Sequence, residues 1–244
     1  MENSFYRTYF EVEKRHWWFR VRRNIILSLI KNHKVPKKAR IFDFGCGSGY
    51  LAGYLQNLGY DVSGSDMSHE AIDFGVSKGI KNLHVVEPGK TVPGGHFDLI
   101  LALDVIEHID DDKGAIRDLK EALKPNGTLI ITVPAYRWMW GVQDEVAHHF
   151  RRYNMSSLLN LIADDSSLSV VKKSYFNTLL FLPIAGVRLV SKLFGLKERE
   201  SDFEINNKLL NGIFYFLFNL EPKMLKFLSF PFGVSILLVL KKNE

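Results

Sequence analysis

A glycine-rich loop that follows an aspartate is the part of the sequence best suited to binding a small molecule. The segment 41–55 runs from an apolar stretch into Asp43, passes the alternating glycines Gly45, Gly47 and Gly49, and continues with apolar residues at helical spacing. This order predicts a buried strand, a tight turn and a helix. Glycine lets a backbone approach a ligand closely, and the first turn of a helix leaves N–H groups unpaired. The loop is therefore expected to bind a ligand with a polar edge.

The charge beside this loop indicates the kind of ligand. A carboxylate repels a pyrophosphate but attracts an amine or a sulfonium, so Asp43 favours a cationic ligand. Tyr50 stands where the dinucleotide fingerprint G-x-G-x-x-G has its last glycine, which disfavours a nicotinamide cofactor. Asp66 ends the next predicted strand, where an acid can accept hydrogen bonds from both hydroxyls of a ribose. Together these features predict an adenosine-binding βα unit.

Four segments carry a resemblance to a known family. They are the loop 43–49, Asp66 after the next strand, the apolar strand and turn 97–109, and the proline-glycine turn and strand 123–134. In this order and spacing they resemble the class I S-adenosylmethionine-dependent methyltransferases, in the branch that includes the quinone-biosynthesis methyltransferases. The resemblance covers about residues 39–176. It implies S-adenosylmethionine as cofactor, with S-adenosylhomocysteine as product.

The resemblance also implies a fold and a set of cofactor contacts. The fold is α/β, with a doubly wound, mostly parallel, seven-stranded Rossmann-like sheet whose last strand is antiparallel. One arginine near the start of the chain would pair with the methionine carboxylate of the cofactor, although the helix that carries it could simply pack on the sheet. For Glu87, contact with the adenine and plain exposure in a loop are both open. The cofactor-binding candidates are Arg20, Arg23, Asp43, Gly45, Cys46, Gly47, Gly49, Asp66, Met67, Glu87, Leu103 and Asp104.

The segment 134–153 is expected to form loops at the same edge of the sheet and to bind the methyl acceptor. Methyl transfer from a sulfonium is a direct displacement, in which alignment of the two reactants does most of the work. A base is needed only when the acceptor is a hydroxyl or a similarly weak acid. Candidate bases are His108, His148 and His149, and candidate acceptor-binding residues are Trp138, Trp140, Arg151, Arg152 and Tyr153. Core packing of the aromatic residues and backbone bonding of His108 are the alternatives.

No metal site is expected from the sequence. The acids 110–112 are consecutive, so their side chains cannot all face one ion, and they suit the solvated start of a helix. His148 and His149 with Asp144 could be imagined as ligands, but adjacent histidines in a loop seldom share one ion.

Composition divides the chain into four parts. These are a helical cap, the Rossmann-like core, a hydrophobic helical insertion or lid, and the final strand, over residues 1–38, 39–176, 177–232 and 233–244. Residues 1–40 carry eleven Lys or Arg and three acids, whereas residues 41–112 carry three and twelve. A basic surface and an acidic cofactor region are therefore separate.

The insertion has no apolar run of the roughly 20 residues that span a bilayer. Its short apolar helices, edged with lysines, suit the surface of an anionic membrane, a homodimer contact or a lid over the substrate. The single cysteine and the lack of a signal-peptide layout predict a cytoplasmic protein, located at the inner membrane face if the insertion binds lipid.

These observations predict an S-adenosylmethionine-dependent methyltransferase that acts on a small or lipid-linked acceptor, at oxygen. The end of the fourth predicted strand reads Ala102-Leu103-Asp104-Val105, unlike the Asp/Asn-Pro-Pro-Tyr of methyltransferases that modify nucleic-acid amines, so no nucleic-acid partner is expected. The rivals are a nicotinamide oxidoreductase and a non-catalytic module that binds a membrane or a partner and retains the fold.

Overall fold

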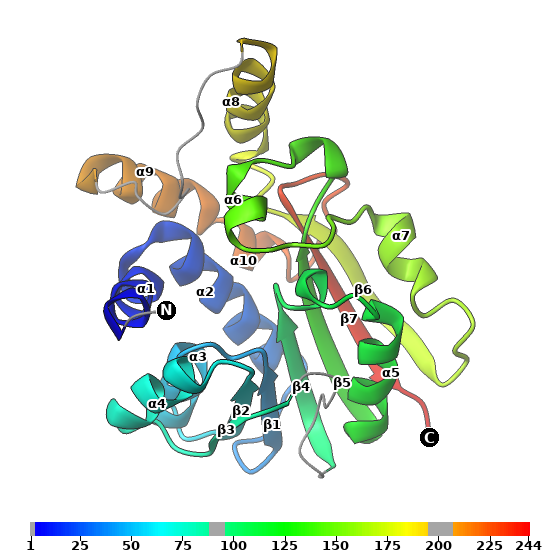
Figure 1. Ribbon diagram of the computed structural model, residues 1–244. Coiled ribbons are helices and arrows are strands. Elements are labelled where there is room, and N and C mark those ends of the chain that lie inside the picture. Colours follow the sequence, from blue (N-terminus) through cyan, green and yellow to red (C-terminus); the bar gives the residue numbers. More distant parts are fainter. Residues whose placement is uncertain (1–2, 88–95, 195–206) are drawn as a thin grey trace.

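A seven-stranded sheet forms the centre of the molecule (Figure 1). The computed structural model describes residues 3–87, 96–194 and 207–244. The strands lie in the order β3-β2-β1-β4-β5-β7-β6. Their bounds are β1 (Arg40–Phe44), β2 (Asp61–Asp66), β3 (Leu83–Val85), β4 (Phe97–Leu103), β5 (Leu123–Pro134), β6 (Leu168–Phe176) and β7 (Ser235–Lys242).

The first five strands are parallel, and β7 runs antiparallel between β5 and β6. The parallel strands β1 and β4 are apolar along most of their length because helices cover both faces of the sheet. Ile41 and Leu99 belong to one apolar layer, whereas Phe42 and Ile100 belong to the other. The sheet therefore confirms the predicted fold class.

Ten α-helices and two short 3₁₀ helices occur in the described residues. Their bounds are α1 (Asn3–Arg15), α2 (Trp17–Asn32), α3 (Tyr50–Asn57), α4 (His69–Ser77), α5 (Asp112–Ala122), α6 (Val142–Val146), α7 (Met155–Asn160), α8 (Phe181–Phe194), α9 (Lys208–Phe218), α10 (Glu221–Met224), η1 (Ile106–His108) and η2 (Arg137–Met139). Side-chain caps begin several of them. The Ser68 hydroxyl accepts from the Ala71 N–H, and the Asp111 carboxylate accepts from the Gly114 N–H.

The two helix layers contain different parts of the chain. Apolar residues of α2, α3 and α4 pack on one face of the sheet, and those of α5 and α7 pack on the other. Figure 1 shows α2, α3 and α4 on the side away from α5 and α7. The expectation of loops throughout 134–153 is wrong in detail, since this segment contains η2 and α6.

The segment between β6 and β7 packs against the N-terminal helices. The edge of Trp17 on α2 meets the rings of Phe214 and Phe218 on α9, with centroids 5.6 and 5.8 Å apart. Asn24 on α2 also donates to Asn219 at 2.7 Å. Figure 1 shows α8 extending away from the sheet. Within the described residues no helix is both long enough and apolar enough to cross a membrane.

Candidate active site

The glycine loop joins the carboxyl end of β1 to α3. Gly45, Gly47 and Gly49 all have positive φ angles, of 69, 55 and 73°, which residues with a Cβ rarely adopt. Gly45 also has no room for a side chain, because a Cβ there would lie 2.3 Å from Cγ2 of Val105. A Cβ on Gly47 would meet nothing within 4 Å. The loop therefore needs glycine for its backbone shape, and at Gly47 it leaves the backbone open to a ligand.

Asp66 fixes this loop from the end of the neighbouring strand β2. Its Oδ2 accepts from the Gly47 N–H at 2.8 Å, and its Oδ1 accepts from the Ser68 N–H at 3.0 Å. Met67 beside it is 61% exposed. Cys46 is buried in the loop, and burial raises the pKa of its thiol. The thiol is thus protonated and acts as a small apolar group.

Three carboxyl groups gather around the loop. Asp43 is 3% exposed, and Glu13 of α1 is 8% exposed and accepts from the Ser48 hydroxyl at 3.2 Å. Burial raises the pKa of Asp43 to about 7; Arg22 opposes this shift, and Glu13 and Asp66 add to it. Burial likewise raises the pKa of Glu13 to about 7. A cluster of crowded carboxylates is an environment that favours a positively charged ligand.

Arg22 is a residue of this site that the sequence analysis missed. Its side chain is 13% exposed, and its Nη1 donates to Asp104 Oδ2 at 2.5 Å and to the Leu103 carbonyl at 3.4 Å. With Arg23, Phe19, Ile26 and other residues it lines a cavity of about 10 Å³ between α2 and the start of α3. Positions 19, 22, 23 and 26 lie on one face of a helix, so helical spacing could have identified Arg22.

The two arginines proposed from the sequence lie in different places. The Arg23 guanidinium lies in the same cavity lining and over the Tyr54 ring, 4.6 Å from its centroid. The Arg20 guanidinium lies over the ring of Tyr215 on α9, 3.8 Å from its centroid. Contact of either residue with the cofactor stays a prediction.

The carboxyl end of β4 brings Leu103 and Asp104 to the same edge. Leu103 is buried and lines the cavity beside Arg22. Asp104 has a positive φ of 54° and accepts from the Thr132 hydroxyl as well as from Arg22. Glu87, in contrast, is exposed just beyond β3.

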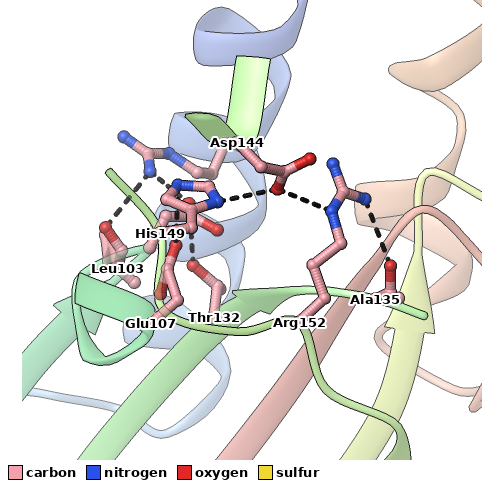
Figure 2. A network of polar contacts seen from close by, with 9 residues as sticks. Leu103, Glu107, Thr132, Ala135, Asp144, His149 and Arg152 are labelled. Carbon is pink, nitrogen blue, oxygen red and sulfur yellow. Dashed lines mark hydrogen bonds and ion pairs between the residues drawn. The ribbon is translucent and has the colours of Figure 1, made fainter. Parts of the chain in front are cut away.

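A cluster of histidines and acids lies just beyond the carboxyl end of β4 (Figure 2). Figure 2 shows His149 between Asp144 and Glu107. His149 Nδ1 lies 2.8 Å from Asp144 Oδ1, and His149 Nε2 lies 4.0 Å from Glu107 Oε1. The rings of His108 and His149 meet edge to face, with centroids 4.6 Å apart. The structure thus brings two of the three candidate bases together, whereas His148 is exposed.

Burial controls the charge of this cluster. It lowers the pKa of His108 to about 4, with a further contribution from His149. It also raises the pKa of Glu107 well above its ordinary range, to which Asp104 adds. Burial alone would raise the pKa of Asp144, but hydrogen bonds from His149 and Arg152 lower it to about 2. Asp144 is therefore the ionised member that orients His149.

The remaining acceptor candidates have internal contacts. Arg152 is buried and donates to Asp144 Oδ1 at 2.7 Å and to the Ala135 carbonyl. The Tyr153 hydroxyl is buried and donates to Asp112 Oδ2 at 2.7 Å, and Arg151 pairs with the same carboxylate at 2.8 Å.

The two tryptophans of the same candidate group are more accessible. Trp138 is 47% exposed and stacks on Tyr136, and Trp140 is half-buried after η2. Contact of any of these five candidates with an acceptor stays a prediction.

Comparison with known proteins identifies the family. Residues 15–168, more than half of the chain, match a family described as a methyltransferase domain. The chain belongs to this methyltransferase family. Its glycine loop, Asp66 and the carboxylates of Asp43 and Glu13 fit the family's cofactor, S-adenosylmethionine, which carries a positive charge and a ribose. The family match favours a methyltransferase over the rival nicotinamide oxidoreductase.

The methyltransferase is similar to two curated proteins named ubiquinone biosynthesis O-methyltransferase. One, from Paraburkholderia phymatum, is 31% identical over 114 residues, which are 41% of this chain and 47% of the relative. The other, from Idiomarina loihiensis, is 24% identical over 209 residues, which are 72% of this chain and 82% of the relative. The first match thus spans about half of the relative's length.

A solved structure shares the fold of the methyltransferase. It is a coclaurine N-methyltransferase bound to N-methylheliamine and S-adenosylhomocysteine, with a TM-score of 0.56. The identity is 15%, and the match covers 90% of this chain and 72% of that one.

Proposed function

We propose that this methyltransferase transfers the methyl group of S-adenosylmethionine to a hydroxyl oxygen of a small or lipid-linked acceptor. The observation that carries the proposal is the pair of half-buried histidines, His108 and His149, at the carboxyl edge of the sheet, with ring centroids 4.6 Å apart. A neutral amine attacks through its own lone pair and loses its proton only afterwards, whereas a hydroxyl must lose its proton as the methyl group arrives. The names of the two curated relatives support an oxygen acceptor.

Each part of the chain has a task in this reaction. S-adenosylmethionine, when bound, supplies an activated methyl group and leaves as S-adenosylhomocysteine. Asp66 would accept from the ribose hydroxyls, and Asp43 would face the positive charge of the cofactor. The histidine cluster would take the hydroxyl proton, with His149 held in place by Asp144. The apolar side chains around this edge keep water away, so that the acceptor oxygen is the nucleophile that reacts.

A lipid-linked acceptor is supported by the surface of the segment between β6 and β7. Large apolar side chains of α8 and α9 are exposed there, among them Leu182, Leu193 and Leu209 at 71% or more. A lipid-linked acceptor would reach the enzyme from a membrane surface, and exposed apolar helices edged with lysines suit such a surface.

A methylation assay tests the proposal. Tag-free protein is incubated with labelled S-adenosylmethionine and a panel of phenols, catechols and amines, each with and without an apolar tail, and mass spectrometry locates the added methyl group. We expect the label on oxygen. The variant His149→Asn should lower kcat by about a hundredfold or more, because general-base catalysis typically contributes that much, while the Kd for the cofactor stays within about twofold, since the ring lies outside the glycine loop.

The control is His96→Asn, which removes an exposed histidine just before β4. It should leave kcat unchanged. Methylation of amines alone, at a rate that His149→Asn does not change, would rule out the proposal.

A further inference from the structure

Glu107, His108 and His149 place three metal-ligating side chains at one point. One ligand atom from each lies within 4.8 Å of the other two. Glu107 and His108 belong to η1, just after β4, whereas His149 follows α6. The Phe150 N–H donates to the Glu107 carbonyl at 2.8 Å, so the backbone holds the two segments together. The arrangement is therefore built into the fold.

The Glu107 carboxylate points independently to a missing cation. The side chain is completely buried, and among the described residues neither of its oxygens has a hydrogen-bond partner. Its distance of 4.0 Å from His149 Nε2 is too long for a hydrogen bond. A buried carboxylate without a partner is strongly unfavourable. A cation between Glu107 and the histidines would supply the partner.

Both histidines are oriented as metal ligands usually are. The His149 Nδ1–H donates to Asp144 Oδ1 at 2.8 Å, which leaves the lone pair of Nε2 on the side of Glu107. The His108 ring donates to the Ala147 carbonyl, which leaves its other nitrogen without a proton. Asp144 is itself held by Arg152 and by the Gly141 N–H, at 2.7 and 2.8 Å. Such outer partners fix the tautomer and direction of histidine ligands at metal sites.

We propose that Glu107, His108 and His149 bind a divalent transition-metal ion such as Zn²⁺ or Co²⁺. Two imidazoles and one carboxylate form a ligand set that these ions accept, with bonds of about 2.0–2.2 Å. Small side-chain rotations would bring the three donor atoms to that distance. The sequence analysis expected no metal because it combined His149 with its neighbour His148; the structure combines His149 with η1 instead.

The ion site deepens the proposed function, and its catalytic role rests on that function. Three protein ligands leave coordination positions open. The acceptor hydroxyl would bind at one of them, where the charge of the ion lowers the pKa of the hydroxyl and its proton is released to solvent. With the ion bound, the lone pairs of His108 and His149 are engaged as ligands, so the ion would replace the histidines as the group that makes the hydroxyl lose its proton.

Direct titration tests the site in the full-length, tag-free protein after treatment with a chelator. We expect one Co²⁺ per chain, with the visible absorption bands of nitrogen and oxygen coordination, and competition by Zn²⁺. Glu107→Gln and His149→Asn should weaken Co²⁺ binding by more than about tenfold, and Asp144→Asn by about ten- to a hundredfold. The matched control is His148→Asn, which removes the neighbouring exposed histidine. Asn tolerates the positive φ of 56° at that position, so this variant should bind Co²⁺ as the unchanged protein does.

Thermal unfolding separates a metal ligand from a merely structural acid. Without metal, Glu107→Gln should melt at or above the Tm of the unchanged protein, because Gln carries no carboxyl group whose ionised form lacks a partner in the buried site. Free Co²⁺ at a hundred times its Kd should raise the Tm of the unchanged protein by about 5–10 °C and leave that of Glu107→Gln unchanged. Circular dichroism confirms that each variant is folded.

The outcomes keep the two proposals apart. Absence of Co²⁺ and Zn²⁺ binding by a protein that binds S-adenosylmethionine, or equal loss in His148→Asn and His149→Asn, would overturn the ion site and leave the methyl transfer standing. Co²⁺ binding that depends on Glu107 supports the ion site, whether or not the cofactor binds. If the cofactor does not bind, only the proposed reaction and the catalytic role of the ion fail.

Discussion

Asp43 shows how burial at a single residue can make cofactor binding depend on pH. Its pKa is raised to about 7, so the side chain is mostly protonated at pH 6 and mostly ionised at pH 8. Only the ionised form attracts a positively charged cofactor. We expect Asp43→Asn to raise the Kd for S-adenosylmethionine about 10- to 100-fold at pH 8, the effect of losing one charged contact. At pH 6 the ratio of the two Kd values should be about tenfold smaller.

Isothermal titration calorimetry at both pH values measures this ratio. Because both proteins bind the same cofactor at each pH, any titration of the cofactor itself affects the two Kd values equally. Asp61→Asn, at the opposite end of β2, is the control and should change neither Kd. The free protein should show the reverse trend in stability. A carboxyl group whose folded pKa is raised stabilises the fold at low pH and loses that contribution as the pH rises through 7. A Kd ratio that is the same at pH 6 and pH 8 would contradict this account.

At the level of elements, the glycine loop depends on both its backbone conformation and its packing under Val105. Gly45 and Gly59 have similar φ angles of 69 and 83°, but a Cβ would clash only at Gly45. We expect Gly59→Ala to lower the free energy of unfolding by about 1 kcal/mol, because only the backbone conformation is strained. Gly45→Ala should lower the free energy of unfolding by about 2 kcal/mol more than Gly59→Ala, because Val105 or the end of β1 must move to make room for the methyl group. Urea denaturation measures both, and cofactor binding should be lost only in Gly45→Ala. Equal costs would show that packing under Val105 does not constrain the loop.

The elements were predictable from the sequence where the hydrophobic pattern is local. β4 lies within the predicted strand and turn 97–109 because a continuous apolar run defines it, and β7 lies within the predicted final strand 233–244. β5 begins at Leu123, ahead of the predicted proline-glycine turn, since pairing of Phe97 with Leu123 extends the strand through that turn. No local pattern could predict that extension.

The candidate site was likewise predictable only where its residues are close together in the sequence. Asp43, Gly45 and Asp66 could be identified because strand, turn and acid are close in sequence. The contact of Arg22 with Asp104, and that of His149 with Glu107, join residues far apart in the chain. Only the packing of α2 against the sheet edge and the return of the chain after α6 create them. These tertiary contacts were beyond a reading based on local spacing.

At the level of the whole molecule, the segment between β6 and β7 gives one end of the protein an apolar surface. This lobe surface consists of exposed side chains of α8, α9 and the turn after α10. Phe227 is 79% exposed and Leu193 71%. Exposed lysines lie on the same elements and on α10, at Lys192, Lys208, Lys223 and Lys226. Apolar side chains would enter the lipid boundary while the lysines meet anionic head groups.

We therefore expect the protein to float with vesicles that contain phosphatidylglycerol, more strongly at low salt than at high salt. Replacing Leu193 and Phe227 together by Gln should weaken vesicle binding about 30-fold, since each partly buried apolar side chain contributes roughly 1 kcal/mol. Val76→Gln, which changes an exposed apolar residue of α4, is the control and should float normally. All variants should keep cofactor affinity, because the substituted residues lie outside the glycine loop. If the protein instead forms dimers that the double substitution dissociates, and never floats, the lobe surface is a subunit contact and the acceptor need not come from a membrane.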